Sequence, residues 1–381
     1  MNANHASSIA NPTLARKIKV LIVEDSSVIR SLLSRWLSAE ADIEVVGTAI
    51  DGSQGIVKAR ELSPDIVLLD IEMPVMDGMT ALPEILKAAP RARVIMASTL
   101  TRRGGETTIK ALSSGASDYL AKPDAGQLAG AADYKRDLLM KVRMLGARAL
   151  RGHQAPVMKQ FVEKTPAQAL RIPNPTPATP FRSASRQARP SAIFIGASTG
   201  GPEALRVVVS GLKGQIDVPV LITQHMPILF TKILAEHLTK QTGATVVEAE
   251  HGMEARAGIF YIAPGSHHMT IATSSNVIRI ELNTNPPENF CRPAVDPLFR
   301  SASASLGERA LAVILTGMGH DGREGARAMV GKGALLITQD EDTSVVWGMP
   351  GAVVRAGIAT TTKPLVEIAP AILDVMRGVG I

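Results

Sequence analysis

The sequence predicts an α/β protein with two parallel-sheet domains, each doubly wound, and a proline-rich connection between them. Short apolar runs rich in Val, Ile and Leu alternate with helix-like stretches over residues 18–140 and again over 191–381. Such alternation is typical of parallel sheets that are covered by helices. Residues 141–190 lack this pattern and are dense in Pro, Ser, Thr and Arg. A length of 381 residues also suits two or three folded units.

The first domain begins after a polar stretch, residues 1–17, which we expect to be a flexible N-terminus. Residues 27–40 have the apolar spacing of a helix, and Ser26 or Ser27 is suited to cap its start. Apolar runs rich in branched residues are expected to form buried strands. These strands are expected at residues 19–25, 65–73 and 92–99.

The connection at residues 141–190 carries the positive charge of the chain. It holds ten Lys or Arg and one acidic residue, so its charge is +9, whereas the remaining 31 basic and 34 acidic residues sum to −3. Repeated prolines disfavour helix and predict an extended linker, although residues 136–145 have helical character. The charge indicates either a solvated tether or a surface for an acidic partner. Aromatic residues make up 3% of the chain, so nucleic acid is not expected as a partner.

The second domain, residues 191–381, resumes the alternation with a core of its own. Residues 229–240 have helical spacing between two of its apolar runs. The runs end in small or polar residues, as strands of an open α/β sheet do at the edge that binds ligands. The strands are expected at residues 191–198, 218–226, 258–264, 276–282, 310–318 and 333–340.

Composition predicts a cytoplasmic protein. No apolar run approaches the roughly 18 residues that cross a bilayer, so no membrane insertion is expected. Residues 1–17 contain no apolar signal core. The single cysteine, Cys291, excludes an intramolecular disulfide. A lone thiol is more often an inert packing residue than a nucleophile, and we expect this of Cys291.

Polar side chains gather at the strand ends of the first domain. Glu24 and Asp25 follow the first strand, Asp70 follows the second, Ser98 follows the third, and Lys122 closes a short run. Parallel strands end at one edge of a sheet, where crowded carboxylates need a cation. An oxygen-only cluster suits Mg²⁺, which would neutralise both a carboxylate nucleophile and an incoming phosphoryl group. Lysine and hydroxyl groups nearby would bind phosphoryl oxygens.

The motifs VEDSS, LLDIEMPVMDG, MAST and AKP resemble those of bacterial two-component response regulators, across residues 18–125. The resemblance implies a flavodoxin-like receiver domain in which Asp70 accepts the phosphoryl group. It also implies that Lys122 and the hydroxyl of Ser98, with Thr99 as the rival, form the switch. The Mg²⁺ ligands that it implies are Glu24, Asp25, Asp70 and the backbone carbonyl of Glu72.

In the second domain, residues 193–205 carry the strongest chemical signal. Gly196, Ser198 and Gly200 form a G-x-S-x-G arrangement between a strand and a helix-like run. Such a turn can expose the Ser198 hydroxyl, and the following helix N-terminus would favour developing negative charge. The same glycines could instead cradle a nucleotide phosphate, but the full dinucleotide pattern and the P-loop lysine are absent.

A serine nucleophile needs a base, and two further strand ends supply candidates. His225 and Asp321 both follow predicted strands, so they point to the sheet edge that holds Ser198. The order Ser, His, Asp differs from that of α/β-hydrolases, which argues against simple membership of that fold. His268 is the substitute for His225, or else it binds substrate or a buried backbone group. No histidine spacing suits zinc.

GASTGGPEAL, QHMP, APGSHHM, RPAVDPLFRS, LTGMGHDG and QDEDTSVVWGMPGAV resemble the chemotaxis protein-glutamate methylesterases, over nearly all of residues 191–381. By this resemblance Ser198, His225 and Asp321 form the catalytic triad. Thr199 and the backbone amide of Met318 would form the oxyanion site. His320 receives no role, and the esterase reaction needs no cofactor.

The resemblance implies an enzyme that hydrolyses glutamate γ-methyl esters, and deamidates selected glutamines, on the cytoplasmic helices of methyl-accepting chemotaxis receptors. A chemotaxis histidine kinase would supply the phosphoryl group, and the unphosphorylated receiver would cover Ser198 until Asp70 is modified. Two alternatives stay open. One is a non-enzymatic regulator whose second domain binds a partner or nucleic acid, and the other is a hydrolase of small free esters.

Overall fold

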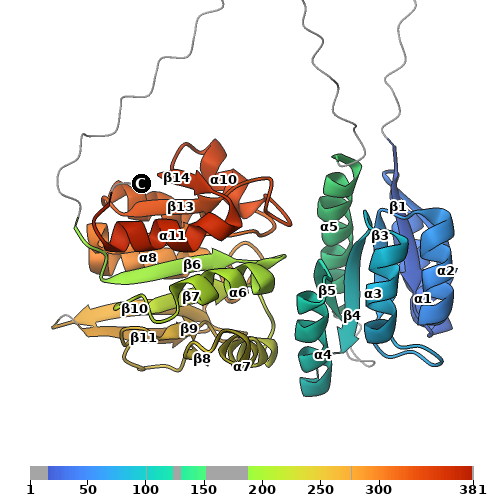
Figure 1. The fold of residues 1–381 in the computed structure, drawn as a ribbon, viewed down its shortest axis with the longest axis horizontal. Helices are drawn as coiled ribbons and strands as arrows, with labels where there is room; N and C mark the ends of the chain where they lie inside the picture. Colours follow the sequence, from blue (N-terminus) through green and yellow to red (C-terminus); the bar gives the residue numbers. More distant parts are fainter. Residues whose placement is uncertain (1–15, 100, 123–129, 152–187, 276, 380–381) are drawn as a thin grey trace, which may run out of the picture.

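The structure, a computed structural model, describes residues 16–99, 101–122, 130–151, 188–275 and 277–379. Two α/β domains lie side by side, with α4, β5 and α5 of the first facing the second (Figure 1). Each domain is built on its own parallel sheet, which confirms the predicted fold class. Among the described helices, none is both long enough and apolar enough to cross a membrane.

The N-terminal domain contains a five-stranded sheet in the order β2-β1-β3-β4-β5, with every pair parallel. The central strand β3 is buried along its whole length, as strands covered by helices on both faces are. The strands are β1 (Ile18–Val23), β2 (Ile43–Ala49), β3 (Ile66–Asp70), β4 (Arg93–Thr99) and β5 (Asp118–Lys122). The helices are α1 (Ser27–Ser38), α2 (Gly52–Leu62), α3 (Gly78–Ala88), α4 (Arg102–Ser113) and α5 (Gly130–Arg151).

Helices α1 to α4 begin at residues whose side-chain oxygens accept a hydrogen bond from a backbone amide of the first turn. This caps amides that have no partner within the helix. Ser26, not Ser27, is the cap of α1. The other three caps are Asp51, Asp77 and Thr101.

The predicted linker start at residue 141 is wrong, because α5 continues to Arg151. Buried Leu138, Val142 and Leu145 follow at helical spacing and pack into the core of the N-terminal domain. Arg143 adds ion pairs to that domain. Apolar spacing therefore outweighs the basic composition of this stretch. The rest of the predicted linker, residues 152–187, lies outside the described residues, as do residues 1–15 of the predicted N-terminal segment.

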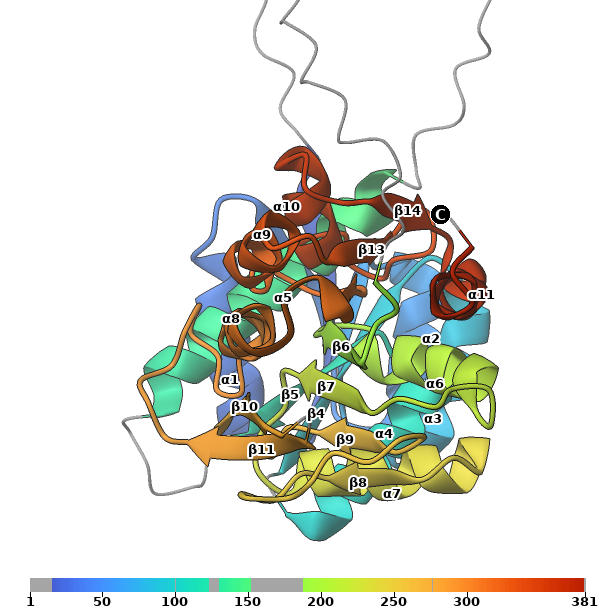
Figure 2. The same cartoon turned by 90° about the vertical axis from the view of Figure 1, so that its left-hand side faces the viewer.

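The C-terminal domain contains a seven-stranded sheet in the order β14-β13-β12-β6-β7-β9-β8. Helices α6, α7 and α11 cover one face, and α8, α9 and α10 cover the other (Figure 2). The strands are β6 (Ala192–Ala197), β7 (Val220–Gln224), β8 (Val246–Glu248), β9 (Phe260–Ile262), β12 (Ala310–Ile314), β13 (Leu335–Gln339) and β14 (Thr361–Lys363). The helices are α6 (Gly201–Leu212), α7 (Phe230–Thr242), α8 (Val295–Leu306), α9 (Arg323–Gly331), α10 (Met349–Arg355) and α11 (Leu365–Met376), with a short 3₁₀ turn at Gly307–Arg309.

One strand expected from the sequence is not part of the central sheet of the C-terminal domain. The run at 276–282 belongs to β11 (Val277–Asn283), which pairs antiparallel with β10 (His268–Ser274) in a separate hairpin. Every second residue of β11 is exposed or half-buried, so only one of its faces is covered. A strand of the central sheet would be buried on both faces, and the alternation of polar residues in this run reflects the difference.

The order of strands creates a switch point beside β6. The chain leaves β6 toward β7 on one side and later returns to β12 on the other. In open α/β sheets, ligands bind outside the carboxyl ends of the strands at such a point. The loops after β6, β7 and β12 therefore meet at one edge, and this edge faces the N-terminal domain (Figure 1).

Candidate active site

Three carboxylates meet at the strand ends of the N-terminal domain, as predicted from the sequence. Oxygen atoms of Glu24, Asp25 and Asp70 all lie within 4.8 Å of one another. Burial, together with the charge of Asp70, raises the pKa of Glu24, and burial raises the pKa of Asp70. Crowded, partly desolvated carboxylates of this kind favour a divalent cation, and an oxygen-only donor set fits Mg²⁺.

Lys122, at the end of β5, joins this cluster. Its Nζ lies 2.8 Å from Oδ1 of Asp70 and 2.9 Å from Oε2 of Glu24. Burial would lower the pKa of Lys122, but the two carboxylates outweigh burial and raise it. The ammonium group is therefore charged and already beside Asp70, the carboxylate that the sequence resemblance predicts as the phosphoacceptor.

Two hydroxyls at the end of β4 were candidates for a switch residue. The Ser98 hydroxyl is buried and donates to the carbonyl of Gly104 in the first turn of α4, at 3.1 Å. The Thr99 hydroxyl lies 3.3 Å from that of Thr101, the cap of α4. Glu72, on the loop after Asp70, has an exposed side chain, so its expected role rests on its backbone carbonyl.

The turn after β6 presents Ser198 at the switch point. The Ser198 amide donates to the carbonyl of Thr316 at 3.1 Å, and its carbonyl accepts from Nε2 of Gln224 at 2.9 Å. Gly200 adopts a left-handed conformation (φ 76°) as the N-cap of α6. A Cβ atom on Gly201 would lie 1.9 Å from Oε1 of Gln224. The turn therefore requires both glycines for its shape and for close packing.

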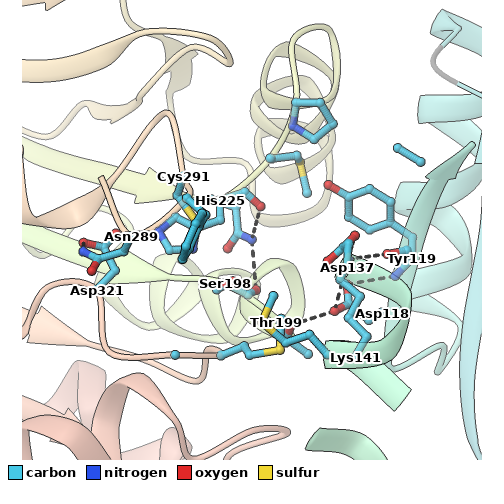
Figure 3. Close-up of a pocket in the computed structure, with 18 of the residues that line it drawn as sticks. Asp118, Tyr119, Asp137, Lys141, Ser198, Thr199, His225, Asn289, Cys291 and Asp321 are labelled. Carbon is cyan, nitrogen blue, oxygen red and sulfur yellow. Dashed lines mark hydrogen bonds and ion pairs between the residues drawn. The ribbon is translucent and has the colours of Figure 1, made fainter. Parts of the chain in front are cut away.

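His225 and Asp321 form the hydrogen bond that the sequence predicts. Nε2 of His225 donates to Oδ2 of Asp321 at 2.7 Å (Figure 3). The Asp321 carboxylate also accepts from the amides of Val295 and Asp296, at 2.6 and 3.1 Å, and from that of Gly322 at 2.9 Å. Burial would raise the pKa of Asp321, but His225 and the helix amides lower it to about 2. The carboxylate is therefore ionised and held in place.

Cys291, expected to be an inert packing residue, lies against the other ring nitrogen of the histidine. Its Sγ is 3.5 Å from Nδ1 of His225. Burial opposes a charged imidazole, but Cys291 and Asp321 outweigh burial and raise the pKa of His225 well above its usual value. Among the hydrogen bonds of the described residues, none joins the Ser198 hydroxyl to His225. Both residues line the same cavity, and hydrogen bonds of this kind commonly tighten only with substrate bound.

The predicted oxyanion residues also line this cavity, whose volume is ≈ 1060 Å³. Thr199 and Met318 lie on the loops after β6 and β12 and line the same cavity as Ser198. The Thr199 carbonyl accepts from the hydroxyl of Thr316 at 2.9 Å, so the loop after β12 holds the turn after β6. The two loops are thereby fixed relative to each other.

His268, the alternative candidate for the base, is hydrogen-bonded to the backbone at both ring nitrogens. Its Nδ1 accepts from the amide of Ala294 at 3.2 Å, and its Nε2 donates to the carbonyl of Pro286 at 3.0 Å. Both ring nitrogens are therefore occupied, and His268 ties down the loop that carries Cys291. His320 lines the cavity with an exposed side chain.

Sequence reasoning missed two residues that hold the site together. Nε2 of Gln224 donates to the carbonyls of both Ser198 and His225, at 2.9 and 3.3 Å. Nδ2 of Asn289 donates to Oδ1 of Asp321 at 3.0 Å. Gln224 had a usable signal, because a buried amide at a strand end directly before His225 needs partners. Asn289 lies in a loop without periodicity, so no pattern indicates it.

The N-terminal domain covers this site. The hydroxyl of Thr199 donates to Oδ2 of Asp118, at the start of β5, at 2.6 Å. Tyr119 stacks on Phe230, the first residue of α7, with ring centroids 5.3 Å apart. Residues of both domains line the cavity, and Figure 3 shows Asp118, Tyr119, Asp137 and Lys141 facing the Ser198 side. The N-terminal domain therefore forms one wall of the cavity.

The fold and the site together define a class, a hydrolase domain of α/β architecture carried on the same chain as a response-regulator receiver. The sequence model of the family described as CheB methylesterase matches residues 193–372, and that of the response regulator receiver domain matches residues 20–133. The chain accordingly belongs to the CheB methylesterase family, with the receiver domain N-terminal to the methylesterase domain.

Relatives match along nearly the whole chain. The protein-glutamate methylesterase/protein-glutamine glutaminase of Maricaulis maris is 46% identical, with 94% of this chain and 96% of that protein covered. The protein of the same name from Azospirillum brasilense is 47% identical, with 93% and 91% covered. The solved Thermotoga maritima CheB methylesterase catalytic domain is 36% identical and covers 49% of this chain and 100% of its own, with a TM-score of 0.48.

Proposed function

We propose that this chain is a phosphorylation-activated protein-glutamate methylesterase with protein-glutamine glutaminase activity. It hydrolyses glutamate γ-methyl esters, and deamidates selected glutamines, on the cytoplasmic helices of chemoreceptors during adaptation in bacterial chemotaxis. It therefore acts in the cytoplasm. The observation that carries this proposal is the His225–Asp321 hydrogen bond of 2.7 Å in the cavity that also holds Ser198. A buried imidazole oriented by a carboxylate is what activates a serine nucleophile.

The His225–Asp321 contact supports Nδ1 of His225 as the nitrogen that takes the serine proton. Because Asp321 occupies Nε2 of His225, Nδ1 is the nitrogen left to take the proton of Ser198, and the Ser198 hydroxyl replaces the Cys291 thiol that lies 3.5 Å from it. Oγ of Ser198 then attacks the ester carbonyl and forms a tetrahedral intermediate. When this collapses, the C–O bond to the methoxy group breaks, and His225 returns the proton so that methanol leaves. Water attacks the acyl-enzyme in the same way, releasing the glutamate and restoring Ser198.

The oxyanion of each tetrahedral intermediate needs donors that are already in place. Thr199 and the amide of Met318 lie on the two loops that flank Ser198, and the Thr316–Thr199 hydrogen bond fixes these loops to each other. A preorganised donor of this kind commonly contributes a few kcal/mol to transition-state stabilisation. Glutamine deamidation follows the same course, with ammonia as the leaving group instead of methanol.

The receiver supplies control. The Asp70 carboxylate takes a phosphoryl group from the phosphohistidine of a chemotaxis kinase, as a P–O bond forms and the P–N bond breaks. The residues that would hold Mg²⁺ are Glu24, Asp25, Asp70 and the backbone carbonyl of Glu72, and the ion would neutralise phosphoryl charge. The Lys122 ammonium, already 2.8 Å from Asp70, binds a phosphoryl oxygen. The Ser98 hydroxyl binds another, leaving the Gly104 carbonyl of α4.

Phosphorylation of the receiver would control the esterase domain through access to Ser198. Helix α4 packs against α7 and against α6, whose Pro202 lines the cavity, and Asp118 of β5 contacts Thr199 directly. A change at Ser98 and α4 therefore reaches the interdomain contact. Phosphorylation shifts the population toward an arrangement in which the receiver has moved off the cavity and a receptor helix enters it.

The proposal is tested by methanol and ammonia release from purified methylated receptor. Ser198→Ala is expected to lose both activities together, because methanol and ammonia are both released when Ser198 is acylated and both substrates give the same acyl-enzyme. The melting temperature of the variant serves as the folding control. A Ser198→Ala enzyme that still released methanol at the wild-type rate would remove the basis for the triad. Hydrolysis of small free esters alone would identify a different substrate class.

A further inference from the structure

A second buried carboxylate, Asp296, lies directly behind Asp321. Asp296 is 4% exposed and sits in the first turn of α8. Its Oδ2 accepts from Nδ2 of Asn289 at 3.1 Å, and the same Nδ2 donates to Oδ1 of Asp321 at 3.0 Å. One amide group therefore bridges the carboxylate that orients His225 and a carboxylate that has no part in the triad.

Each carboxylate also accepts a hydrogen bond from backbone amides at the start of the helix beside the other carboxylate. Asp321, just before α9, accepts from the first amides of α8, while Asp296, in α8, accepts from the Gly325 amide of α9 at 2.7 Å. An added Cβ on Gly325 would lie 2.6 Å from Cβ of Phe299 and 2.9 Å from the carbonyl oxygen of Asp296. Because α8 and α9 touch at this point, a shift of Asp296 would move the amides that hold Asp321. Helix N-termini also stabilise buried negative charge.

The charged groups around Asp296 come from several elements. Asp321 and, through it, His225 are the inner neighbours, and Arg300 lies one turn along α8 in an ion pair with Glu288. Arg323, Glu324 and Arg327 pair with one another on the outer side of α9. Burial, followed by the charge of Asp321, raises the pKa of Asp296 to about 6. Asp296 is therefore largely ionised at neutral pH, so a second negative charge lies close to the His225–Asp321 pair.

We propose that Asp296, acting through Asn289 and the N-terminus of α8, is a positioning residue that holds the Asp321 carboxylate against Nε2 of His225. Its negative charge also supports the imidazolium that forms when His225 takes the serine proton. This proposal rests on the triad of the proposed function. It extends the relay from Ser198, His225 and Asp321 to a residue that touches neither substrate nor base.

The negative charge of Asp296 predicts in which direction the pH dependence of kcat/KM shifts when that charge is removed. His225 acts as a base only when neutral, so its pKa sets the acidic limb of kcat/KM. A nearby negative charge raises that pKa. Removing the charge of Asp296 lowers the pKa of His225 and moves the acidic limb to lower pH. A residue that only stabilised the fold would change the melting temperature and leave the limb where it was.

The test uses Asp296→Asn in the full chain, activated with a phosphodonor and assayed on methylated receptor. We expect kcat to fall about threefold to tenfold, KM to stay unchanged and the acidic limb to move down by about half a pH unit. Glu324→Gln is the matched control, since it removes an exposed carboxylate from the first turn of α9 that has no link to Asn289. This control is expected to keep the wild-type profile.

A second variant keeps the proposal testable if Asp296→Asn fails to fold. Asn289→Ala removes the bridge from a half-buried loop position and leaves α8 intact. We expect it to lower kcat at a wild-type melting temperature. If both variants kept the wild-type kcat and pH profile, or lost only thermal stability, the positioning role would be excluded. The triad is judged separately, because Ser198→Ala loses activity whether or not Asp296 matters.

Discussion

The hydroxyl of Thr199 donates a 2.6 Å hydrogen bond to Oδ2 of Asp118. Thr199 follows the proposed nucleophile, and Asp118 begins β5, the last strand of the receiver, which ends at Lys122. Both residues are buried. A single contact therefore ties the edge of the receiver sheet to the turn that carries Ser198, and it is available only while the domains are closed.

Asp118→Ala is expected to raise the activity of the unphosphorylated enzyme. A hydrogen bond to a charged group contributes about 1.5–3 kcal/mol, so its loss shifts the closed–open equilibrium roughly tenfold or more. Lys141 keeps its other carboxylate, Asp137, at 3.1 Å, so the variant leaves no orphaned charge. Basal methanol release is the measurement, and Glu84→Gln, on the exposed face of α3, is the control. Unchanged basal activity in Asp118→Ala would show that this contact does not hold the domains closed.

Removal of Mg²⁺ is expected to abolish activation and to leave basal activity intact. The carboxylates that fit the ion lie on the receiver, and no residue of the Ser198 site belongs to that cluster. Acetyl phosphate with and without a chelator is the measurement. Asp25→Asn is expected to behave like chelation, whereas Glu72→Gln keeps the response, because Glu72 would bind through its backbone carbonyl. A chelator that stopped basal hydrolysis would contradict this separation.

Cys291→Ala is expected to move the acidic limb of kcat/KM to lower pH. Burial already lowers the pKa of His225, and Cys291 is the largest of the groups that raise it. Without the thiol the pKa of His225 falls, so the neutral base persists at lower pH. A pH–rate profile of the activated enzyme from about pH 5 to 9 measures the shift. A limb that stayed in place or moved upward would mean that Cys291 does not influence the base.

Gly201→Ala is expected to damage the nucleophile turn. Its Cβ would lie 1.9 Å from Oε1 of Gln224, so the amide that holds the carbonyls of Ser198 and His225 must move. Losing these bonds costs about 1–3 kcal/mol, or roughly a five- to 150-fold fall in kcat/KM. Gly331→Ala, at the end of α9 with no atom within 4 Å of the added Cβ, is the matched control. Equal activities in the two variants would disprove the packing argument.

Much of the site could be predicted because the ends of buried strands can be recognised in a sequence. Ser198, His225 and Asp321 each follow an apolar run, and parallel strands bring their carboxyl ends to one edge. No distance information was needed to place them together. The same logic placed Glu24, Asp70 and Lys122.

Other features depend on tertiary packing. Asn289 and Cys291 come from a loop held by His268, and nothing in its local sequence indicates its path. The Thr199–Asp118 bond exists only because two domains meet. The extension of α5, by contrast, could have been predicted from the helical spacing of Leu138, Val142 and Leu145. The basic composition of this stretch favoured a linker instead.

The central claim is that modification of Asp70 opens access to Ser198. The most direct measurement is methanol release from methylated receptor membranes, with and without acetyl phosphate and Mg²⁺, by the wild type and Asp70→Asn. The account predicts that phosphodonor stimulates the wild type, that Asp70→Asn keeps only basal release, and that adding Ser198→Ala removes both. Equal stimulation of the Asp70→Asn enzyme, or a wild type that ignores the phosphodonor, would contradict it.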